Sequence, residues 1–473
     1  MNELLKINDS KFIKLIERLK KLIDGSVFEN HVFIVGGFVR DAVMGNPVKD
    51  VDIVVDVPDG GIGFATWLAF NTGCLINGKN PCTFPSYGTA KLQIYSDPEL
   101  SNIEIECVQT RKEKYDKNSR NPETVFGTLQ EDAMRRDLTI NALYYNISTD
   151  EICDFTKCGL DDIKNHVIRT TGKPDMVFSD DPLRILRVIR FATRFGWKIE
   201  KDTWLGMIMN ARRINILSQE RVTMELNNML MCDTPSVAIE RMDKCNVLRK
   251  VLPSLDISKH VYQDLRPIRS VYQHVLEVLD KTPKVLETRL AALFHDIGKI
   301  KTYDKHFMYH SQIGADMAEE VMKAMKYSNA TIETVKKAIE NHEAFSSYIG
   351  NTIPRPAVIR KFVSKFDGND KDLEVALDLI HANNLGQMYG KKIKQIPGVK
   401  AKIEELDKKS AIESGKKVVI PLSGKDIMAE FNLRSGPVIG TIMQKVKNKV
   451  LEKPDITKEE LFNYVEEYLK AVV

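Results

Sequence analysis

The stretch IVGGFVRDAVMGNPVKDVDIVVD, residues 34–56, decides the fold with which the chain begins. Gly36 and Gly37 close an apolar strand, a short helix follows, and a second strand is expected to begin with Asp50 and Asp52. Side chains two residues apart on a strand point to the same face, so these two aspartates can hold metal ions together. The glycine pair leaves the backbone open enough to admit a triphosphate. Nucleotidyl transfer requires this geometry.

The chemistry of nucleotidyl transfer asks for more carboxylates. Two divalent ions about 3.5–4 Å apart can activate the attacking hydroxyl and stabilise the pyrophosphate that leaves. Magnesium prefers carboxylate and phosphate oxygens. A third carboxylate should come from a neighbouring strand, and IEIECVQTR (103–111) offers Glu104 and Glu106 on one face. A solvated strand end is the ordinary alternative for an Asp-x-Asp pattern, but the glycine pair shortly before it favours function.

The composition of the whole chain is typical of a soluble protein. The 473 residues are 43% hydrophobic with a net charge of +4, and this length allows about two to four domains. Seven cysteines without a Cys-x-x-Cys pair indicate reduced thiols rather than disulfides or a zinc site. The N-terminal segment has the spacing of an amphipathic helix instead of a signal peptide. Because no apolar run reaches the ~18 residues of a membrane span, we expect a cytoplasmic protein with no membrane partner.

Short β-rich runs and helical segments alternate in the first third of the chain. From about Pro174 onward, apolar residues recur at the three- and four-residue spacing of helices. A second helical block, from about Ser270 to Gly386, contains several histidines. The expected fold is therefore an α/β head followed by a long and mostly helical body.

Five motifs in a fixed order give the chain a family resemblance. The first is GGFVRDAVMGNPVKDVD in the opening stretch, and the others are RRDLTINAL (135–143), CDFTKCGLDDI (153–163), DDPLRILRVIRF (180–191) and ERVTMEL (220–226). Together they resemble the tRNA nucleotidyltransferase and poly(A) polymerase family, and within it the CCA-adding enzymes of the bacterial and eukaryotic class. The resemblance implies a polymerase-β-like nucleotidyltransferase head. It also implies template-independent addition and repair of the 3′-terminal CCA of tRNA, using CTP and ATP and releasing pyrophosphate.

The same resemblance assigns roles to residues of the head. Those expected to bind the incoming nucleotide are Gly36, Gly37, Arg40 and Arg136. Those expected to be catalytic are Asp50 and Asp52, which would hold Mg²⁺, and Glu106, which matches the family's third carboxylate five residues before Arg111 on the same strand. The segment 112–132 matches the place of the family's flexible loop, which is associated with the switch from C to A addition. Its presence favours complete CCA addition.

The motif DDPLRILRVIRF predicts a helix that places Asp181 and Arg184 side by side on one face. Asp accepts hydrogen bonds and Arg donates them in a planar fork, so the pair can match a base edge. In the family this pair selects C and then A. Arg187 and Arg190 repeat the spacing and could meet phosphates, whereas the simpler interpretation is an exposed ion pair on a helix. Asp180 stands where the family normally has Glu, which puts base fidelity in question.

A group of histidines predicts a second centre, which would bind a metal. His295 and Asp296 are expected on an apolar helix, with His274 upstream and His310 and His342 downstream. This order resembles the HD phosphohydrolases. Some CCA-adding enzymes carry such a domain, with phosphodiesterase, nucleotidase and phosphatase activity on RNA ends. Imidazole together with carboxylate suits a transition metal such as Ni, Mn, Fe or Zn better than Mg alone.

One position departs from the HD pattern. The family closes its site with an Asp late in the block, where this chain has Asn383. Asn is a neutral and weaker ligand, so hydrolysis could be impaired. Asp378 and His381 lie nearby in the sequence and could compensate.

These patterns predict four domains. They are a nucleotidyltransferase head (1–150), a helical neck and body for nucleotide selection and tRNA binding (151–260), an HD domain (261–386) and a helical tail (387–473). The expected partners are the tRNA acceptor arm, CTP and ATP, and no DNA is expected. Lysines that could contact RNA phosphates, with a solvated face as an equal alternative, are Lys391, Lys392, Lys394, Lys400 and Lys402.

Several other functions remain open at this level. An A-adding or CC-adding specialist and a poly(A) polymerase share the motifs of the head. From another class, the chain could be an HD phosphohydrolase with an inactive head, or an RNA-binding protein without catalytic activity. The aligned carboxylates oppose the last two hypotheses, because binding alone does not need them.

Overall fold

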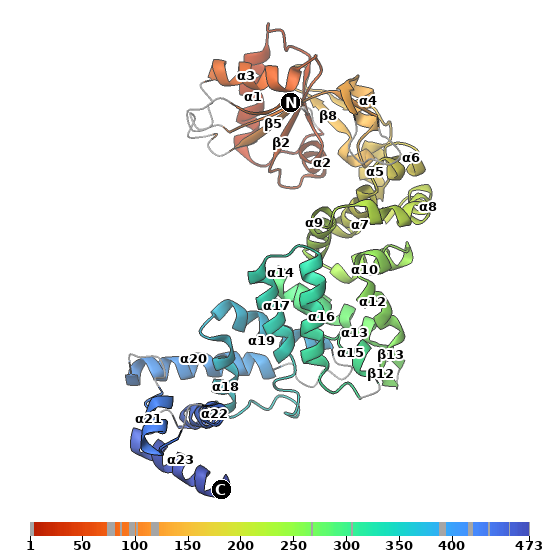
Figure 1. Ribbon diagram of the computed structural model, residues 1–473. Coiled ribbons are helices and arrows are strands. Elements are labelled where there is room, and N and C mark those ends of the chain that lie inside the picture. Colours follow the sequence, from red (N-terminus) through yellow and green to blue (C-terminus); the bar gives the residue numbers. More distant parts are fainter. Residues whose placement is uncertain are drawn as a thin grey trace. The chain divides into compact units, whose positions relative to one another are not determined.

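The computed structural model divides the chain into two compact units, Met1–Pro253 and Ser254–Val473 (Figure 1). The structure describes residues 4–72, 81–85, 88–93, 100, 103–114, 123–265, 268–303, 306–386, 394–414, 420–433, 436–453 and 455–472. The finer division into four domains stays a prediction.

The first unit is built on a seven-stranded sheet with the strand order β3-β4-β5-β2-β1-β8-β9. Its strands are β1 (Val32–Val35), β2 (Val51–Val55), β3 (Cys82–Phe84), β4 (Thr89–Gln93), β5 (Glu104–Gln109), β8 (Leu143–Asn146) and β9 (Ile152–Asp154). Only the β2–β5 pair is parallel among the pairings of this sheet. Helices α1 (Ser10–Ile23), α2 (Gly37–Met44) and α3 (Gly60–Thr72) pack around it (Figure 1). The predicted α/β head is confirmed.

Local sequence explains why this sheet and its first helices form. All four residues of β1 are apolar and buried, as expected for a central strand. Helix α1 begins after Asp9, whose side chain accepts the Lys11 N–H, and it buries one apolar face. Gly36 precedes helix α2 as its N-cap, and Gly45 follows it in the left-handed conformation that commonly closes a helix.

Helices make up most of the rest of the first unit. They are α4 (Leu129–Met134), α5 (Gly159–Asn165), α6 (Pro174–Asp180), α7 (Leu183–Phe195), α8 (Lys201–Asn210), α9 (Gln219–Leu230), α10 (Pro235–Lys244) and α11 (Leu248–Val251), with the 3-10 turns η2 (Thr139–Asn141) and η3 (Ala211–Ile216). Two short sheets join them, an antiparallel pair of β6 (Arg111–Lys114) and β7 (Glu123–Phe126) and a parallel pair of β10 (Val167–Ile168) and β11 (Lys198–Ile199).

Three local expectations were wrong. Strand β2 begins at Val51, so Asp50 precedes it. Arg111 does not share a strand with Glu106, because β5 ends at Gln109 and Arg111 opens β6 of another sheet. Asp181 lies outside helix α7, in extended backbone with φ −137° and ψ 103°. Pro182 follows it, and a residue before proline is pushed out of the helical region.

The second unit is mostly helical. Its elements are α12 (Pro253–Ile257), η4 (Ser258–His260), β12 (Tyr262–Leu265), β13 (Ile268–Ser270), α13 (Val271–Asp280), α14 (Leu286–Phe294), α15 (Lys299–Thr302), α16 (His310–Ala324), α17 (Asn329–Asn341), α18 (Pro356–Val363), η6 (Ser364–Phe366), α19 (Asp370–Gly386), α20 (Gln395–Ser414), α21 (Gly424–Glu430), α22 (Pro437–Glu452) and α23 (Lys458–Val472). Helices α14, α17 and α19 pack against one another, and α16 packs on α17 (Figure 1). The last three helices share an apolar cluster of their own.

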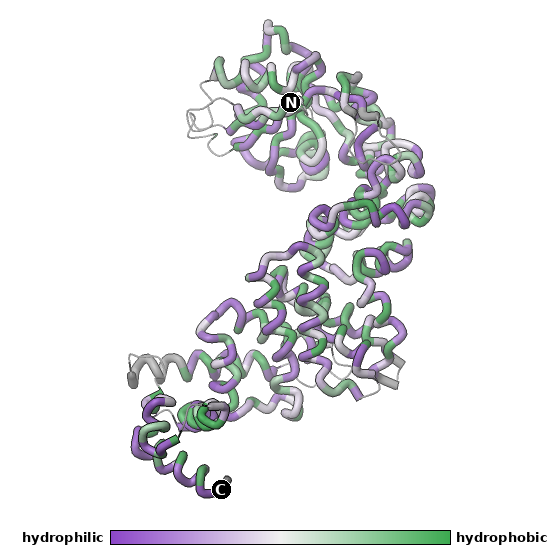
Figure 2. The backbone as a smooth tube through the Cα atoms, in the orientation of Figure 1, coloured by the Kyte–Doolittle hydropathy of each residue, from purple (hydrophilic) through white to green (hydrophobic). Residues whose placement is uncertain are grey.

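Hydrophilic and hydrophobic residues alternate along the helices of both units (Figure 2). Among the described residues, no helix combines the length and the apolar composition that a bilayer crossing needs.

Two candidate active centres

The first centre lies on one face of the sheet, where carboxylates of neighbouring strands meet. Asp52 on β2 and Glu106 on β5 are direct partners in the parallel register, so their side chains share a face. Lys91 on β4 is opposite Glu106, and its Nζ lies 3.2 Å from Glu106 Oε2 and 3.1 Å from Glu104 Oε1. Asp50 is exposed just before β2. The expected third carboxylate is therefore beside Asp52.

Electrostatics make this face a plausible cation site. Desolvation raises the pKa of Asp52, and the negative charge of Glu106 raises it further. The positive charge of Arg136 offsets only part of this increase. The carboxylates of Asp52 and Glu106 are hard oxygen donors of the kind that a divalent cation such as Mg²⁺ prefers. Among the described residues, no three ligand atoms of this centre lie within 4.8 Å of one another. Two such groups of three occur in the second centre.

A pocket of ≈ 330 Å³ opens beside Asp52. The predicted residues that line it are Gly36, Gly37, Arg40, Asp52, Arg136, Arg187 and Arg190. Its other lining residues, which the sequence analysis did not name as site residues, are Asp137, Asn141, Phe191, Arg194, Asn228 and Cys232. Five arginines around one small pocket point to a polyanionic ligand.

Gly36 shapes the floor of this pocket. Its φ of 76° and ψ of −129° lie in a region that side chains exclude. A Cβ at this position would lie 3.7 Å from Arg136 Nη1 and 4.0 Å from Asp52 Oδ2. The first backbone N–H groups of α2 follow directly, and free N–H groups with the positive end of the helix dipole favour phosphate.

Arg40 is buried and held on three sides. Its Nε and Nη2 donate to the Asp41 carboxylate at 2.9 and 2.7 Å, and its Nη1 donates to Asn141 Oδ1 at 2.5 Å. Its guanidinium carbon also lies 5.1 Å from the centre of the Phe191 ring. This arginine therefore contributes a fixed positive charge to the pocket.

The arginines of α7 are anchored by acids from other elements. Arg187 Nε donates to Asp137 Oδ2 at 2.7 Å. Although burial opposes ionisation, the Arg187 charge lowers the pKa of Asp137 to about 2. Arg190 Nε lies 3.2 Å from a carboxylate oxygen of Glu225 on α9, and burial raises the pKa of Glu225. Arg194 is the most exposed of the three pocket-lining arginines of α7, with 52% of its side chain accessible.

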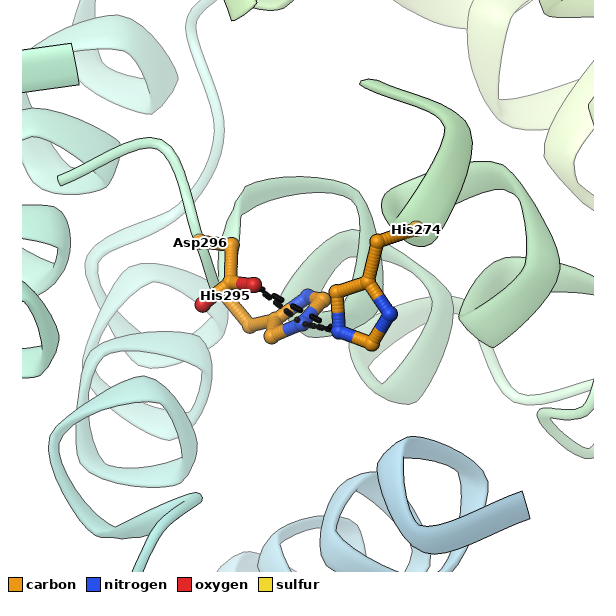
Figure 3. A group of neighbouring side chains, drawn as sticks. All are labelled: His274, His295 and Asp296. Carbon is orange, nitrogen blue, oxygen red and sulfur yellow. Dashed lines mark hydrogen bonds and ion pairs between the residues drawn. The ribbon is translucent and has the colours of Figure 1, made fainter. Parts of the chain in front are cut away.

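The second centre lies in the second unit and collects all five predicted residues. His274 comes from α13, His295 and Asp296 directly follow α14, His310 begins α16 and His342 follows α17. All five are buried. Figure 3 shows the His295 ring between the His274 ring and the Asp296 carboxylate. Because α14 ends at Phe294, the expectation that His295 and Asp296 lie within a helix was wrong.

Backbone carbonyls fix the tautomers of three of these histidines. The Nδ1 atoms of His295, His310 and His342 lie 2.8, 2.8 and 2.7 Å from carbonyl oxygens three residues earlier in the chain. A carbonyl can only accept, so each Nδ1 carries the proton, and in the neutral form of each ring the lone pair of Nε2 points inward. Burial lowers the pKa values of His274 and His342, which favours their neutral forms.

The Nε2 atoms that face inward lie so close in pairs that two lone pairs would repel each other. Each pair therefore needs a shared ion or a shared proton. The Nε2 atoms of His274 and His295 are 3.2 Å apart, and those of His310 and His342 are 3.3 Å apart. Two imidazoles that bind one metal at ~2.0–2.1 Å have a comparable separation. Asp296 faces both pairs, with Oδ2 at 3.3 Å from His295 and Oδ1 at 3.3 Å from His310. The donor set fits a transition metal.

Asp296 itself is fully buried and charged. Although burial opposes ionisation, the His295 ring and Lys299 lower the pKa of Asp296 well below its ordinary value. Lys299 Nζ donates to its Oδ2 at 2.7 Å, while its Oδ1 has no hydrogen-bond donor in good geometry. A buried carboxylate oxygen without a donor is costly, and a cation would satisfy it.

Comparisons with known proteins agree with this geometry. Residues 32–169 match the model of the poly A polymerase head domain, residues 196–258 match a probable RNA- and SrmB-binding site of polymerase A, and residues 269–388 match the HD domain. The multifunctional CCA protein of Nitrosomonas europaea is 32% identical over 301 residues, which are 62% of this chain and 67% of that protein. The chain belongs to the tRNA nucleotidyltransferase and poly(A) polymerase family.

Other members of the family match nearly the whole chain. The mitochondrial CCA tRNA nucleotidyltransferase of Candida glabrata is 27% identical over 490 residues, which are 92% of this chain and 90% of that protein. The crystal structure of the Bacillus stearothermophilus CCA-adding enzyme in complex with CTP covers 98% of both chains with a TM-score of 0.64 and 17% sequence identity. This last likeness supports the fold.

The two residues expected to select the base, Asp181 and Arg184, are arranged differently from our expectation. Asp181 Oδ1 accepts the Leu183 N–H at 3.0 Å, and its Oδ2 accepts Arg221 Nη2 at 2.8 Å. Arg184 is buried, and its Nη2 donates to the Arg135 carbonyl at 2.6 Å. The two side chains have separate partners and do not share a helix face, and neither lines the pocket. The placement on one face was wrong.

Other expected residues of the family sites fall outside the two centres. In α19, Asp378 and His381 do not belong to the described metal-ligand groups, and Asp378 instead accepts Lys400 Nζ at 2.7 Å. Asn383 lies on the same helix. Lys402 pairs with Glu405. Lys394 lies among the described residues, whereas Lys391 and Lys392 lie outside them. Residues 115–122 of the expected flexible loop also lie outside the described residues.

Proposed function

We propose that the chain builds and repairs the 3′-terminal CCA of tRNA from CTP and ATP, with release of pyrophosphate. One observation carries the proposal: five arginines and the N-terminus of α2 line a pocket that also contains Asp52. A triphosphate bound there would have its negative charge neutralised next to a carboxylate pair on the sheet. The relatives named above as CCA-adding enzymes support the same reaction.

Each group of residues has a distinct part in this proposal. Arg136, Arg187, Arg190 and Arg194 would neutralise the phosphates, and Arg40 would add a fixed charge behind them. Asp50, Asp52 and Glu106 would hold Mg²⁺, which when bound activates the attacking hydroxyl and stabilises the leaving pyrophosphate. The stated pKa shift of Asp52 supports this assignment, because a cation relieves the repulsion from Glu106.

Selection of C and then A is assigned to Asp181 and Arg184. To meet a base edge, Arg184 would exchange the Arg135 carbonyl for the base, and Asp181 would use lone pairs not occupied by Arg221. Arg184 donates to the carbonyl groups of Arg135 and Val177, which orient its side chain. In the family a Glu normally helps to orient this arginine, and this chain has the shorter Asp180 at that position. The two carbonyl groups would supply part of the orientation that the Glu gives. The tRNA acceptor arm would supply the hydroxyl.

The test uses tRNA lacking CCA, with CTP and ATP supplied singly and together and the products sequenced. We expect CC with CTP alone and CCA with both. Asp52→Ala and Glu106→Ala should abolish incorporation. Glu104→Ala is the matched control, because Glu104 lies two residues from Glu106 on the same strand and contacts Lys91. Equal loss in both glutamate variants, or no incorporation by the unmodified protein, would refute the proposal.

The same experiment distinguishes the close alternatives. Addition limited to C or to A would identify a specialist. Runs of A on RNA that is not tRNA would identify a poly(A) polymerase. The full CCA product is the outcome expected from the overall match with CCA tRNA nucleotidyltransferases.

A second candidate function is phosphohydrolysis at RNA ends, favoured by the two histidine pairs that face Asp296. The residues that would hold Ni²⁺, Mn²⁺ or a similar ion are His274, His295, Asp296, His310 and His342. Such an ion activates water and neutralises phosphate charge when bound. We expect metal-dependent hydrolysis of a cyclic phosphodiester, lost in Asp296→Asn and kept in Asp378→Asn and Asp52→Ala. Hydrolysis by Asp296→Asn at the original rate would refute this function.

We place the protein in the cytoplasm by proposal. Its six described cysteines are free thiols, as a reducing compartment requires. The Candida relative is named as mitochondrial, so cell fractionation with a tagged protein decides between the two compartments.

A further inference from the structure

Helix α4 carries a fully buried carboxylate that the proposed reaction does not use. Asp132 accepts from six donors in the described structure. Its Oδ1 accepts Arg135 Nε at 2.9 Å, Arg135 Nη2 at 2.6 Å and the Arg111 N–H at 3.3 Å. Its Oδ2 accepts Arg136 Nε at 3.3 Å, Arg136 Nη2 at 3.1 Å and the Tyr144 hydroxyl at 2.6 Å. This side chain has no exposed surface.

The consequence for Arg136 is that only one end of its guanidinium remains available to a ligand. Nε and Nη2 are taken by Asp132, and Nε also donates to the Tyr144 hydroxyl at 3.0 Å. The Tyr144 ring centre lies 5.3 Å from the guanidinium carbon. The third nitrogen, Nη1, lies beside Gly36 and the pocket.

This support matters because of the charges around it. Arg40, Arg187 and Arg190 line the same pocket, and like charges repel an arginine side chain that is free to rotate. A buried counter-charge offsets this repulsion and fixes the rotamer before the ligand arrives. A ligand then loses less free energy in ordering the side chain, which raises affinity without any new contact.

We propose that Asp132 is a positioning residue that holds Arg136 Nη1 toward the triphosphate, with Tyr144 as its second support. The inference rests on the proposed function, because Arg136 must meet the nucleotide for its position to matter. Asp132 also binds Arg135, whose carbonyl accepts Arg184 Nη2. One carboxylate therefore anchors both the phosphate-facing arginine and the backbone group that holds the base-selecting arginine.

The test is a double-mutant cycle between Asp132 and Arg136. Asp132→Asn keeps the shape but replaces one acceptor oxygen by a donor that faces arginine N–H groups. We expect the kcat/KM for CTP to fall about 10- to 100-fold, mainly through KM. In an Arg136→Ala background the same change should cost less than about threefold, because of the two guanidinium groups that Asp132 binds only that of Arg135 is then left to lose. Tyr144→Phe should reduce kcat/KM by a few-fold in the same direction.

A matched control separates positioning from general loss of stability. Asp372 is another buried aspartate, and it accepts Thr334 Oγ1 at 2.6 Å and Lys337 Nζ at 3.3 Å in the second unit. Asp372→Asn should lower the melting temperature and leave the KM for CTP unchanged. If Asp132→Asn does not fold, the Tyr144→Phe and Arg136→Ala cycle decides. Equal losses with and without Arg136 in the cycle would overturn the proposal.

Binding of CTP, measured without tRNA by equilibrium dialysis, keeps this inference distinct from the proposed function. If the unmodified protein binds CTP but adds nothing to tRNA, the proposed function fails, and the binding cycle still tests Asp132. If the unmodified protein adds CMP and the cycle is additive, the positioning role alone fails. If it neither binds nor adds nucleotide, both fail.

Discussion

Metal binding at the second centre should stabilise the second unit strongly. The Nε2 atoms of His274 and His295 lie 3.2 Å apart, those of His310 and His342 lie 3.3 Å apart, and Asp296 Oδ1 has no donor in good geometry. A bound ion would be coordinated by both nitrogen pairs and by Asp296 Oδ1, and only the folded state brings these atoms together. At a free metal concentration of 100 times the Kd, this linkage is worth about 2.7 kcal/mol. For a unit of roughly 150–250 residues, each 1 kcal/mol raises Tm by about 2–4 °C, so we expect a rise of about 5–11 °C.

Calorimetry of metal-stripped protein, with and without added Mn²⁺ or Ni²⁺, measures this rise. Asp296→Asn should remove most of it, since the charged ligand shared by both histidine pairs is lost. Asp372→Asn, which alters a buried aspartate of the same unit outside the cluster, should keep it. A rise of the same size in Asp296→Asn would show that the ion binds elsewhere, and no rise in the unmodified protein would refute the assignment of the cluster as a metal centre.

Three further changes test the first unit. Gly36→Ala should lower stability by about 1–3 kcal/mol and weaken CTP binding, since its φ of 76° and ψ of −129° exclude a side chain. Denaturant titration beside Gly63→Ala, where a Cβ meets open space and φ is not positive, checks this. The pKa of Asp137 is about 2 in the folded state, below the unfolded value near 3.9, so the ionised group contributes about 2 kcal/mol to the free energy of unfolding. This contribution is present above pH ~4 and disappears as the pH falls toward 2. In Asp137→Asn the acid unfolding curve should be flatter over that range, and an unchanged curve would contradict the assignment. Arg194→Ala should raise the KM for CTP several-fold, weaken its salt dependence and leave Tm within about 1 °C, because the side chain is half exposed; an unchanged KM would exclude Arg194 from phosphate binding.

Much of the first centre was predictable from local sequence. The apolar strand and the glycine pair specify β1 and the start of α2. The shared face of Asp52 and Glu106 instead depends on the register between β2 and β5, because strand periodicity sets only which side chains of one strand share a face. The arginines at 187 and 190 were predictable from helical spacing. Arg194 continues the same stripe at the next turn, so the signal for it was present.

Helical spacing failed where proline intervened. Asp181 and Arg184 are three residues apart, yet Pro182 places Asp181 in extended backbone, and tertiary contacts with Arg221 and the Arg135 carbonyl separate the two side chains. Partners that lie 40 or 49 residues away in the chain cannot be derived from a local pattern.

The sequence by itself determined the chemistry available to this protein: carboxylates on strands, arginines on one helix, and histidines with an Asp in the HD order. Residue type and local periodicity suffice for this, since they act within a few residues. Only the tertiary structure decided which of these groups meet. It gathered the four histidines around Asp296, and it buried Asp132 behind Arg136. These outcomes depend on how helices and strands pack, because burial and hydrogen-bond partners are set by elements distant in the chain.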